Sequence, residues 1–392
     1  MAKTSVVLVG INGYGVKIAK DVFANMDKYD ITVAGVVVRN IETATLRDEV
    51  LARKIPYYST LEAFYADNKA DLAIICTPIS CHLEHASIAM RNGSDVLCEK
   101  PTAATMTQSA QMEAVAKETG KNLNIAFQLS YVPAVWALKQ DIMDGVLGAP
   151  KKFSSLICWP RNSAYYARTW CAKIKWNGEY VLDSIAMNAC AHYLHLLYFL
   201  LGDTMDAAAQ PESLEALLCR ANDIETFDTA MLKVQAKGVD LHFLATHTSR
   251  RKIEPRMRFE FENAVVEMNE REGDGYIRAI FNDGTVKEYG VIQPAYYNKI
   301  PYCCRVAEGK EKPVCTPATA SAHLKTINAI TELVDVHTVK DTVTEDEVVI
   351  VEGMDALLEQ SFREGKMPWE LTDRFGMPTH VELTDYQWGD RL

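Results

Sequence analysis

The sequence predicts a doubly wound parallel α/β sheet over residues 1–127, followed over residues 128–392 by an α+β domain with a mostly antiparallel, open sheet. Three observations support this prediction. Strand-like and helical segments alternate through the first half, a glycine-rich turn follows the first strand, and serial strand-like segments fill the second half. Alternation favours parallel strands joined by helices, whereas consecutive strands favour antiparallel pairing.

The first domain is expected to alternate strand and helix with short connections. Strands are expected at 5–9, 31–38, 70–77, in SDVLC and at 122–129, and helices at 13–25, in LEAFYADN, in HLEHASIAMRNG and at about 105–120. The continuous apolar run at 31–38 is typical of a strand buried on both faces of a parallel sheet. Thr105 and Gln108 have the spacing of a capping box at a helix start.

The second domain is expected to begin with a helix at 133–144 and the strand KKFSSLICW. A long helix is expected from about Ser184 to Leu201, with Asp183 in the position of its N-cap. The serial strands are expected at 214–220, 228–237, 239–248, 256–262, 264–269, 276–281 and 285–292, followed by a helix near 321–335. The tail after Pro368 is polar and expected to be peripheral.

Composition excludes several classes of protein. The 392 residues are 48% hydrophobic and 24% charged, as in ordinary globular proteins. A net charge of −11 argues against nucleic acid and anionic membranes as partners. The ten cysteines form no CxxC pair or zinc spacing, so thiols such as Cys76, Cys98 and Cys158 are expected to be reduced and buried. No segment resembles a signal peptide or membrane span, which predicts a cytoplasmic protein.

The glycine turn GINGYG predicts a dinucleotide site. Gly10, Gly13 and Gly15 follow a strand and open a helix, where backbone N–H groups and the helix N-terminus attract a pyrophosphate. Asn12 stands where the GxGxxG pattern has its second glycine, and Tyr14 completes the turn.

The tip of the second strand bears on the choice between NAD and NADP. NAD-binding sheets often place an acid there for the ribose hydroxyls, but this strand ends in Val38, Arg39 and Asn40. Arg39 either receives a 2′-phosphate or stacks on adenine, which favours NADP, or it is a solvated loop residue.

Lys100 is a candidate catalytic residue. It lies between a strand end and Pro101, where a desolvated ammonium can stabilise the alkoxide that develops as a hydride leaves its carbon. Glu99 either orients this ammonium or braces the loop.

One helix face carries the second set of candidates. Ser184, Asn188 and His192 are four residues apart and His195 is three further on, so a continuous helix would place them on one side. A buried histidine is more often structural than catalytic. No clustered acids accompany the His192/His195 pair, so no metal site is expected.

GINGYG, ICTPISCHLEHASIAMRNGSDVLCEKP and NACAHYLHLLYFLLG resemble the Gfo/Idh/MocA oxidoreductase family, specifically over about 1–205. The resemblance implies a Rossmann domain, an open antiparallel sheet domain, NAD or NADP, and substrates that are mostly sugars, polyols or their derivatives. It makes Lys100 and His192 the proton-handling pair and places Asn188 where the family usually has Asp. The further residues that it assigns to the cofactor are Thr77, Pro78, His82, Glu99 and Gln128.

The aromatic and cationic stretch at 160–180 supplies candidate substrate contacts. These are Tyr166, Arg168, Trp170 and Lys173. Aromatic faces suit the C–H surfaces of sugars, and the cations could meet a carboxylate or phosphate. The alternative is a packed loop between domains.

The leading hypothesis is an NAD(P)-dependent oxidoreductase acting on a sugar-like secondary alcohol or its ketone. One alternative is a redox-neutral glycosidase, lyase or epimerase that oxidises its substrate transiently. Another is a nucleotide or sugar sensor without activity. An open sheet is commonly covered by a neighbouring copy, which predicts a homodimer or homotetramer.

Overall fold

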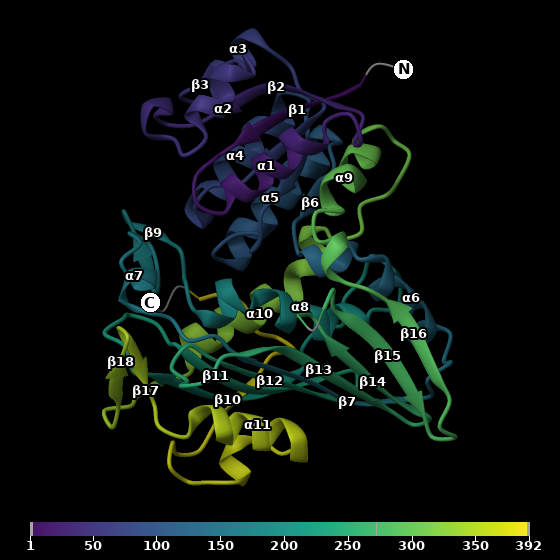
Figure 1. The fold of residues 1–392 in the computed structure, drawn as a ribbon, viewed down its shortest axis with the longest axis vertical. Helices are drawn as coiled ribbons and strands as arrows, with labels where there is room; N and C mark the ends of the chain where they lie inside the picture. The colour runs from purple at the N-terminus through teal and green to yellow at the C-terminus, as the bar shows by residue number, and fades with distance from the viewer. Residues whose placement is uncertain (1–2, 272, 390–392) are drawn as a thin grey trace. The chain divides into compact units, whose positions relative to one another are not determined.

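The computed structural model describes residues 3–271 and 273–389, which form two compact units (Figure 1). The first unit runs to Tyr131 and also takes in Tyr296–Ala320. The second comprises Val132–Ala295 and the chain from Ser321 onward. The chain therefore leaves the first unit, builds most of the second, and returns to the first.

The first unit contains a parallel sheet, with the order β3-β2-β1-β4-β5-β6 among the described residues. Its strands are β1 (Thr4–Val9), β2 (Ile31–Val37), β3 (Tyr57–Tyr58), β4 (Leu72–Ile75), β5 (Asp95–Cys98) and β6 (Leu123–Ile125). The predicted doubly wound sheet is confirmed. Because all its strands are parallel, the loops that follow them lie at one edge of the sheet.

Helices connect these strands. They are α1 (Gly15–Asn25), α2 (Arg47–Ala52), α3 (Leu61–Asp67), α4 (His82–Arg91) and α5 (Met106–Thr119), with the short 3₁₀ segments η1 (Ile41–Thr43), η2 (Ile79–Cys81) and η3 (Gln128–Tyr131). Thr105 and Gln108 form the predicted capping box at the start of α5. The returning segment adds α9 (Lys299–Ala307), which the sequence did not predict.

The second unit contains a large, mostly antiparallel sheet, with the order β16-β15-β14-β13-β7-β12-β11-β10-β17 within the described part of the chain. Its strands are β7 (Pro150–Cys158), β10 (Ser213–Arg220), β11 (Thr229–Ala236), β12 (Val239–Thr246), β13 (Ile253–Phe261), β14 (Ala264–Asn269), β15 (Tyr276–Phe281), β16 (Val286–Gly290) and β17 (Val336–Thr338). Strand β7 lies in the middle, parallel to β12 and antiparallel to β13.

Helices cover both faces of this sheet. They are α6 (Pro133–Met143), α8 (Ala191–Leu200), α10 (Pro317–Leu333) and α11 (Met354–Glu364), while the short helix α7 (Ser163–Tyr166) lies in the loop after β7. Helices α8 and α11 both pack on β7 and β12, from opposite faces (Figure 1). Short segments complete the unit: β8 (Lys175–Trp176), β9 (Glu179–Tyr180), η5 (Gln293–Ala295), β18 (Val343–Glu345), β19 (Val348–Ile350) and η6 (Pro368–Glu370).

Two expectations for the second domain are wrong. The helix expected from Ser184 to Leu201 is interrupted: Ile185–Ala189 is a π-helix, and α8 starts only at Ala191. The side chain of Ser184, rather than that of Asp183, caps the π-helix by accepting a hydrogen bond from the N–H of Met187 at 3.2 Å. A π-helical turn contains one residue more than an α-helical turn, and the spacing of polar residues in the sequence does not reveal this.

The tail after Pro368 is not peripheral. Strand β20 (Thr379–Glu382) pairs antiparallel with β10, and Leu383 directly after it is fully buried. Phe375 joins the apolar cluster beneath α11, which includes Met354 and Leu358. The tail thus completes the core of the second unit on the side that α11 covers.

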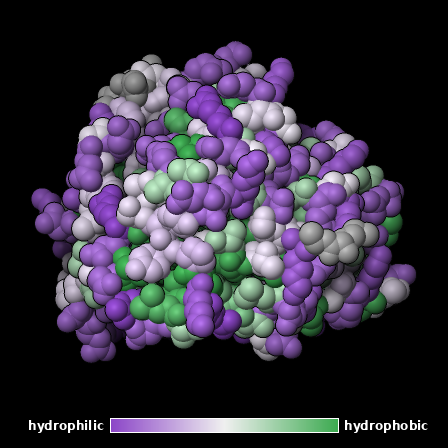
Figure 2. All heavy atoms as spheres, turned by 90° about the horizontal axis from the view of Figure 1, so that it is seen from above, coloured by the Kyte–Doolittle hydropathy of each residue, from purple (hydrophilic) through white to green (hydrophobic). Residues whose placement is uncertain are grey.

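The surface agrees with the composition, and two of the three thiols expected to be buried are buried. Polar and charged side chains cover much of the face shown in Figure 2, with hydrophobic side chains in patches between them. Cys98 and Cys158 are buried free thiols, whereas Cys76 is partly exposed. No helix in the described ranges is long and apolar enough to cross a membrane.

Candidate active site

The glycine turn joins β1 to α1 and requires glycine at two positions. Gly10 has φ +86°, and a Cβ there would lie 2.5 Å from the carbonyl oxygen of Cys76. A Cβ at Gly15 would lie 2.3 Å from the carbonyl oxygen of Gly10. Gly13 has φ +55°, but a Cβ there would meet no atom within 4 Å. The turn therefore has no room for a side chain at Gly10 or Gly15, whereas the space next to Gly13 is open.

This turn fits an anionic group. The first turn of α1 carries no acidic residue, and its N-cap residue Tyr14 makes no side-chain cap. The positive end of the helix dipole and the open space at Gly13 suit a pyrophosphate. Asn12 has a different role, because its Oδ1 accepts a hydrogen bond from the N–H of Thr45 at 3.1 Å, which ties the turn to the segment after β2.

The tip of β2 presents a cation rather than an acid. Arg39 is exposed, and Asn40 accepts a hydrogen bond from the N–H of Glu42 at 2.9 Å. The Glu42 carboxylate is paired with Arg47 at 2.9 Å. Burial raises the pKa of the Cys81 thiol, and the charge of the Arg39 guanidinium opposes part of this effect.

His82 joins two loops at the same edge of the sheet. It is the first residue of α4 and is 1% exposed. Its Nε2 lies 3.1 Å from the carbonyl oxygen of Thr77, and its Nδ1 lies 2.9 Å from that of Pro101. Burial lowers the pKa of His82. The imidazole therefore fastens the Thr77-Pro78 loop to the loop that carries Lys100.

Glu99 and Lys100 follow β5 directly. Glu99 is buried, and its Oε2 accepts a hydrogen bond from the N–H of Lys100 at 3.3 Å. Its Oε1 forms an ion pair with Nζ of Lys299, a fully buried residue at the start of α9. Lys100 is half-buried and precedes Pro101 through a cis peptide bond. Through these contacts Glu99 connects the loop after β5 to the start of α9.

Lys299 was missed from the sequence. Burial lowers its pKa, but the carboxylate of Glu99 has the opposite effect, and the net pKa lies above the usual lysine value. Its ammonium also lies 5.5 Å from the centre of the Tyr14 ring. The hydroxyl of Tyr14 donates to Oε1 of the buried Gln128 at 3.4 Å, and burial raises its pKa to about 12. A lysine directly before the largely apolar run at 300–304 was the available signal.

The first unit thus brings together the cofactor-site candidates that follow different strands. Loops after β1, β2, β4, β5 and β6 carry them. They are Gly10, Asn12, Gly13, Tyr14, Gly15, Arg39, Thr77, Pro78, His82, Glu99, Lys100 and Gln128. Their common edge is the place where open parallel sheets bind ligands.

The second unit carries the other candidates. Asn188 lies in the π-helix and His192 in the first turn of α8, and both are half-buried. His195 is fully buried and stacks on Phe199 with the ring centres 5.8 Å apart. Burial lowers the pKa of His195 well below its usual value, so this residue belongs to the core.

The aromatic and cationic loop is ordered by its own side chains. The Arg168 guanidinium lies 4.0 Å from the centre of the Tyr165 ring and 5.4 Å from that of Trp170. Its Nη2 donates to Sγ of Cys171 at 3.1 Å. Tyr166 lies between Tyr165 and Arg168 in the sequence and Lys173 follows Trp170, and both are half-buried. The loop holds a cation between aromatic faces on the surface of the second unit.

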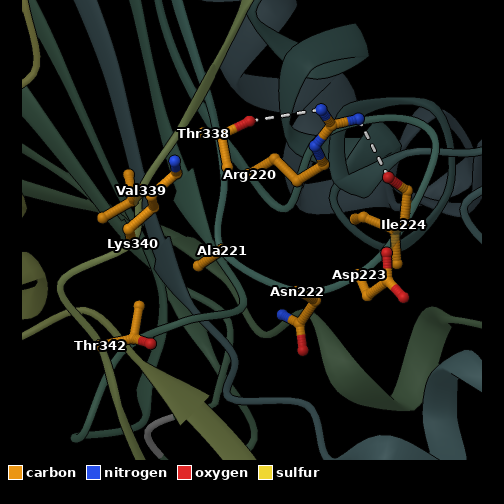
Figure 3. A pocket seen from close by; sticks show the side chains of 9 residues that line it. All are labelled: Arg220, Ala221, Asn222, Asp223, Ile224, Thr338, Val339, Lys340 and Thr342. Atoms are coloured by element: carbon orange, nitrogen blue, oxygen red, sulfur yellow. Dashed lines mark hydrogen bonds between the residues drawn. The ribbon is translucent and has the colours of Figure 1, made fainter.

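An open pocket of about 460 Å³ lies elsewhere in this unit, at the ends of β10 and β17 (Figure 3). Arg220 lines it, but its guanidinium donates to the carbonyl oxygen of Ile224 at 3.0 Å and to Oγ1 of Thr338 at 3.3 Å. The pocket contains none of the predicted site residues, so it is not a candidate active site.

A sequence model of the oxidoreductase family with an NAD-binding Rossmann fold matches residues 4–127. Over these residues the chain matches the Gfo/Idh/MocA oxidoreductase family. The resemblance seen in the sequence is confirmed, and with it an NAD(P)-binding fold in the first unit.

Two relatives of this chain are named as sugar dehydrogenases. It is 35% identical to the D-glucoside 3-dehydrogenase of Escherichia coli over 20% of this chain and 23% of the relative. It is 23% identical to the D-apiose dehydrogenase of Paraburkholderia graminis over 62% of each. These matches span less than two thirds of either relative.

A solved structure shares the fold along nearly the whole chain. The WlbA dehydrogenase of Chromobacterium violaceum, in complex with NADH and UDP-GlcNAcA, superposes with a TM-score of 0.70 at 20% identity and covers 98% of each chain. At this identity the comparison shows the two-domain fold alone.

Proposed function

We propose that this chain is an NAD(P)-dependent oxidoreductase that transfers a hydride between the nicotinamide and a secondary hydroxyl or ketone of a sugar, polyol or sugar derivative. The observation that carries the proposal is the position of Lys100 just after β5. Glu99, the residue before it, is fixed by a buried ion pair with Lys299. An ammonium fixed at the ligand-binding edge of an NAD(P)-binding sheet can stabilise charge on a reacting oxygen. Relatives named as dehydrogenases of a D-glucoside and D-apiose support the substrate class.

The residues have distinct roles in this reaction. The bound nicotinamide would accept a hydride in oxidation and supply it in reduction. Lys100 donates a hydrogen bond to the reacting oxygen and stabilises it as an alkoxide. His192 takes the hydroxyl proton in oxidation and returns it in reduction. Asn188 holds a substrate hydroxyl or the His192 ring through its amide.

The cofactor is NADP rather than NAD in this proposal. The tip of β2 offers the exposed guanidinium of Arg39, and the first acid after it, Glu42, is paired with Arg47. A guanidinium binds a 2′-phosphate through charge-assisted hydrogen bonds, whereas a carboxylate would repel it. A relative named as an NADP(+)-dependent scyllo-inositol 2-dehydrogenase, from Bacillus subtilis, is compatible with this choice.

The substrate is held in the second unit by the loop around Arg168. Tyr166, Trp170 and Lys173 complete the proposed set. The Arg168 guanidinium already lies between two aromatic rings, so little side-chain freedom is lost when it meets an anionic group on the substrate. This arrangement favours a sugar derivative that carries a carboxylate or phosphate.

A homodimer or homotetramer forms in this proposal through the sheet of the second unit. Helix α11 covers the sheet at β7 and β12, while β16 is an edge strand whose Val286 is 52% exposed. Copies that pair across the sheet would cover such surfaces. Light scattering at micromolar concentration tests this directly, and a monomer would contradict it.

Replacing Lys100 by methionine tests the function itself. Wild-type protein should reduce NADP⁺ or NAD⁺ with at least one member of a panel of sugars, polyols and sugar acids. Lys100→Met should lower kcat by about 10²–10³-fold, the cost of removing one preorganised donor to a developing oxyanion. Nucleotide affinity, followed by fluorescence titration, should change less than about threefold.

Lys117→Met, at an exposed position on α5, is the matched control and should leave both quantities unchanged. Full turnover by Lys100→Met would contradict the assignment. Hydrogen exchange at a sugar carbon without net cofactor reduction would instead indicate the redox-neutral alternative. Tight nucleotide binding without any exchange would indicate a sensor.

A further inference from the structure

Asn188 occupies the position at which the family usually has Asp, and its surroundings explain how an amide can serve there. It lies in the π-helix Ile185–Ala189, whose extra residue per turn changes which side chains meet. π-helical segments occur frequently at functional sites. The side chain that Asn188 meets in this geometry is the carboxylate of Asp183, five residues earlier.

Asp183 is buried, and each of its carboxylate oxygens accepts a hydrogen bond. Oδ1 accepts a hydrogen bond from Nδ2 of Asn188 at 2.8 Å, and Oδ2 accepts one from the N–H of Ala172 at 2.6 Å. The main chain of Asp183 is held as well: its N–H donates to the carbonyl oxygen of Lys173 at 2.9 Å, and its carbonyl accepts from Oγ1 of Thr226 at 2.6 Å. The carboxylate therefore has a fixed position.

The charge state of Asp183 follows from two opposed effects. Burial raises the pKa of this carboxyl above its usual value, and the hydrogen bonds from Ala172 and Asn188 and the Arg168 guanidinium offset only part of the increase. A buried carboxylate is tolerated when donors satisfy its oxygens. Because both carboxylate oxygens accept hydrogen bonds from N–H groups, these contacts favour the ionised form of Asp183.

An ionised carboxylate can only accept hydrogen bonds, so it decides the orientation of the amide beside it. The NH₂ group of Asn188 must face Asp183, and Oδ1 of Asn188 therefore faces the opposite way. We infer that Asp183 is a positioning residue that holds Asn188 as a hydrogen-bond acceptor toward the substrate hydroxyl or the His192 ring. The amide oxygen thus takes over the acceptor role of the family's carboxylate, and this inference rests on the proposed function.

The same carboxylate also holds the proposed substrate loop. Ala172, which donates to Oδ2 of Asp183, follows Cys171, and Sγ of Cys171 accepts a hydrogen bond from Arg168. The loop with Arg168 and the π-helix with Asn188 are thus both attached to Asp183. One buried side chain sets the positions of two groups that the proposal assigns to substrate binding.

Exchanging the two side chains tests this inference. Asn188→Asp alone places two carboxylates within hydrogen-bond distance and should lower the melting temperature and lower kcat by about 10-fold or more. Asp183→Asn alone leaves the amide of Asn188 without a defined orientation and should lower kcat by a similar factor. The double variant Asp183→Asn/Asn188→Asp restores one donor and one acceptor and should recover kcat to within about threefold of wild type.

Thermal unfolding of the same four proteins gives a readout that needs no substrate. Recovery of the melting temperature in the double variant supports the Asp183–Asn188 contact, and absence of recovery overturns it. Recovery of the melting temperature with kcat unchanged in Asp183→Asn would show a merely structural role and would also overturn the inference. Absence of turnover in the wild type would contradict the proposed function alone, because the unfolding experiment still reports the contact. Asp346→Asn, at an exposed turn, is the matched control.

Discussion

The ammonium of Lys299 pairs with the carboxylate of Glu99, 200 residues earlier in the sequence, and both side chains are buried. The pair fixes the side chain of Glu99, which directly precedes Lys100 in the sequence. Removing one partner of a buried ion pair leaves an uncompensated charge, which costs far more than the pair contributes. The returning segment that carries α9 is therefore part of the nucleotide-binding unit.

Lys299→Met should lower the free energy of unfolding by about 3–5 kcal/mol, because the carboxylate of Glu99 loses its partner in a buried site. The double variant Glu99→Gln/Lys299→Met should be more stable than Lys299→Met, since no charge remains. Urea unfolding of the full chain measures both. Equal stability of wild type and Lys299→Met would contradict the importance of the pair.

The two glycines of the turn should respond differently to alanine. Gly13→Ala should lower the free energy of unfolding by only about 1–2 kcal/mol, the cost of a left-handed backbone at a residue with a side chain. Its methyl group would enter the open space proposed for the pyrophosphate, so the main effect should be a loss of nucleotide affinity. Gly10→Ala should destabilise the apoprotein more, because its Cβ would collide with the carbonyl oxygen of Cys76. Thermal melting and fluorescence titration separate the two effects. Equal melting temperatures of the two variants would contradict this account of the turn.

Arg39→Ala should weaken NADP binding about 10-fold or more and leave NAD binding nearly unchanged, because only NADP carries the 2′-phosphate that the guanidinium is proposed to meet. Titration of the protein with each dinucleotide at constant ionic strength measures this difference. Arg91→Ala, at the exposed end of α4, controls for the loss of a surface charge. Parallel losses for both dinucleotides would argue for adenine stacking instead.

Stability should fall as the pH decreases below about 6.5. Burial, with a further contribution from Arg161, lowers the pKa of His247 from 6.5 to about 3. Below pH 6.5 this imidazole stays neutral in the native state but takes up a proton on unfolding, which favours the unfolded state. The free energy of unfolding is therefore unaffected by this group above pH 6.5 and decreases as the pH falls toward 3. From pH 6.5 to pH 5 the loss is about 2 kcal/mol.

His247→Gln should flatten this pH dependence, although its stability at neutral pH will differ from that of the wild type. Urea unfolding between pH 5 and pH 8 measures the slope. The matched control is His380→Gln, which alters an exposed residue of β20 and should leave the slope unchanged. An unchanged slope in His247→Gln would show that this imidazole titrates normally in the native protein.

Most elements of the fold could be predicted from the sequence because their signals are local. The apolar run of β2, the capping box at Thr105 and the glycines of the turn each report on a few adjacent residues. Strands β7 and β10 to β16 lie within a few residues of their predicted bounds for the same reason. Helices α9 and α11 and strand β20 were not predicted, because their burial depends on partners far along the chain.

The candidate residues were identified by type, but their relations depend on tertiary structure. The sequence by itself determined the parallel sheet, the glycine turn and the lysine that follows β5, since periodicity and turn chemistry are properties of short segments. Only the tertiary structure decided that Lys299 neutralises Glu99 and that the π-helix brings Asn188 to Asp183. A buried charge needs a partner in space, and spacing along the chain does not show which distant residue, or which helical register, will supply it.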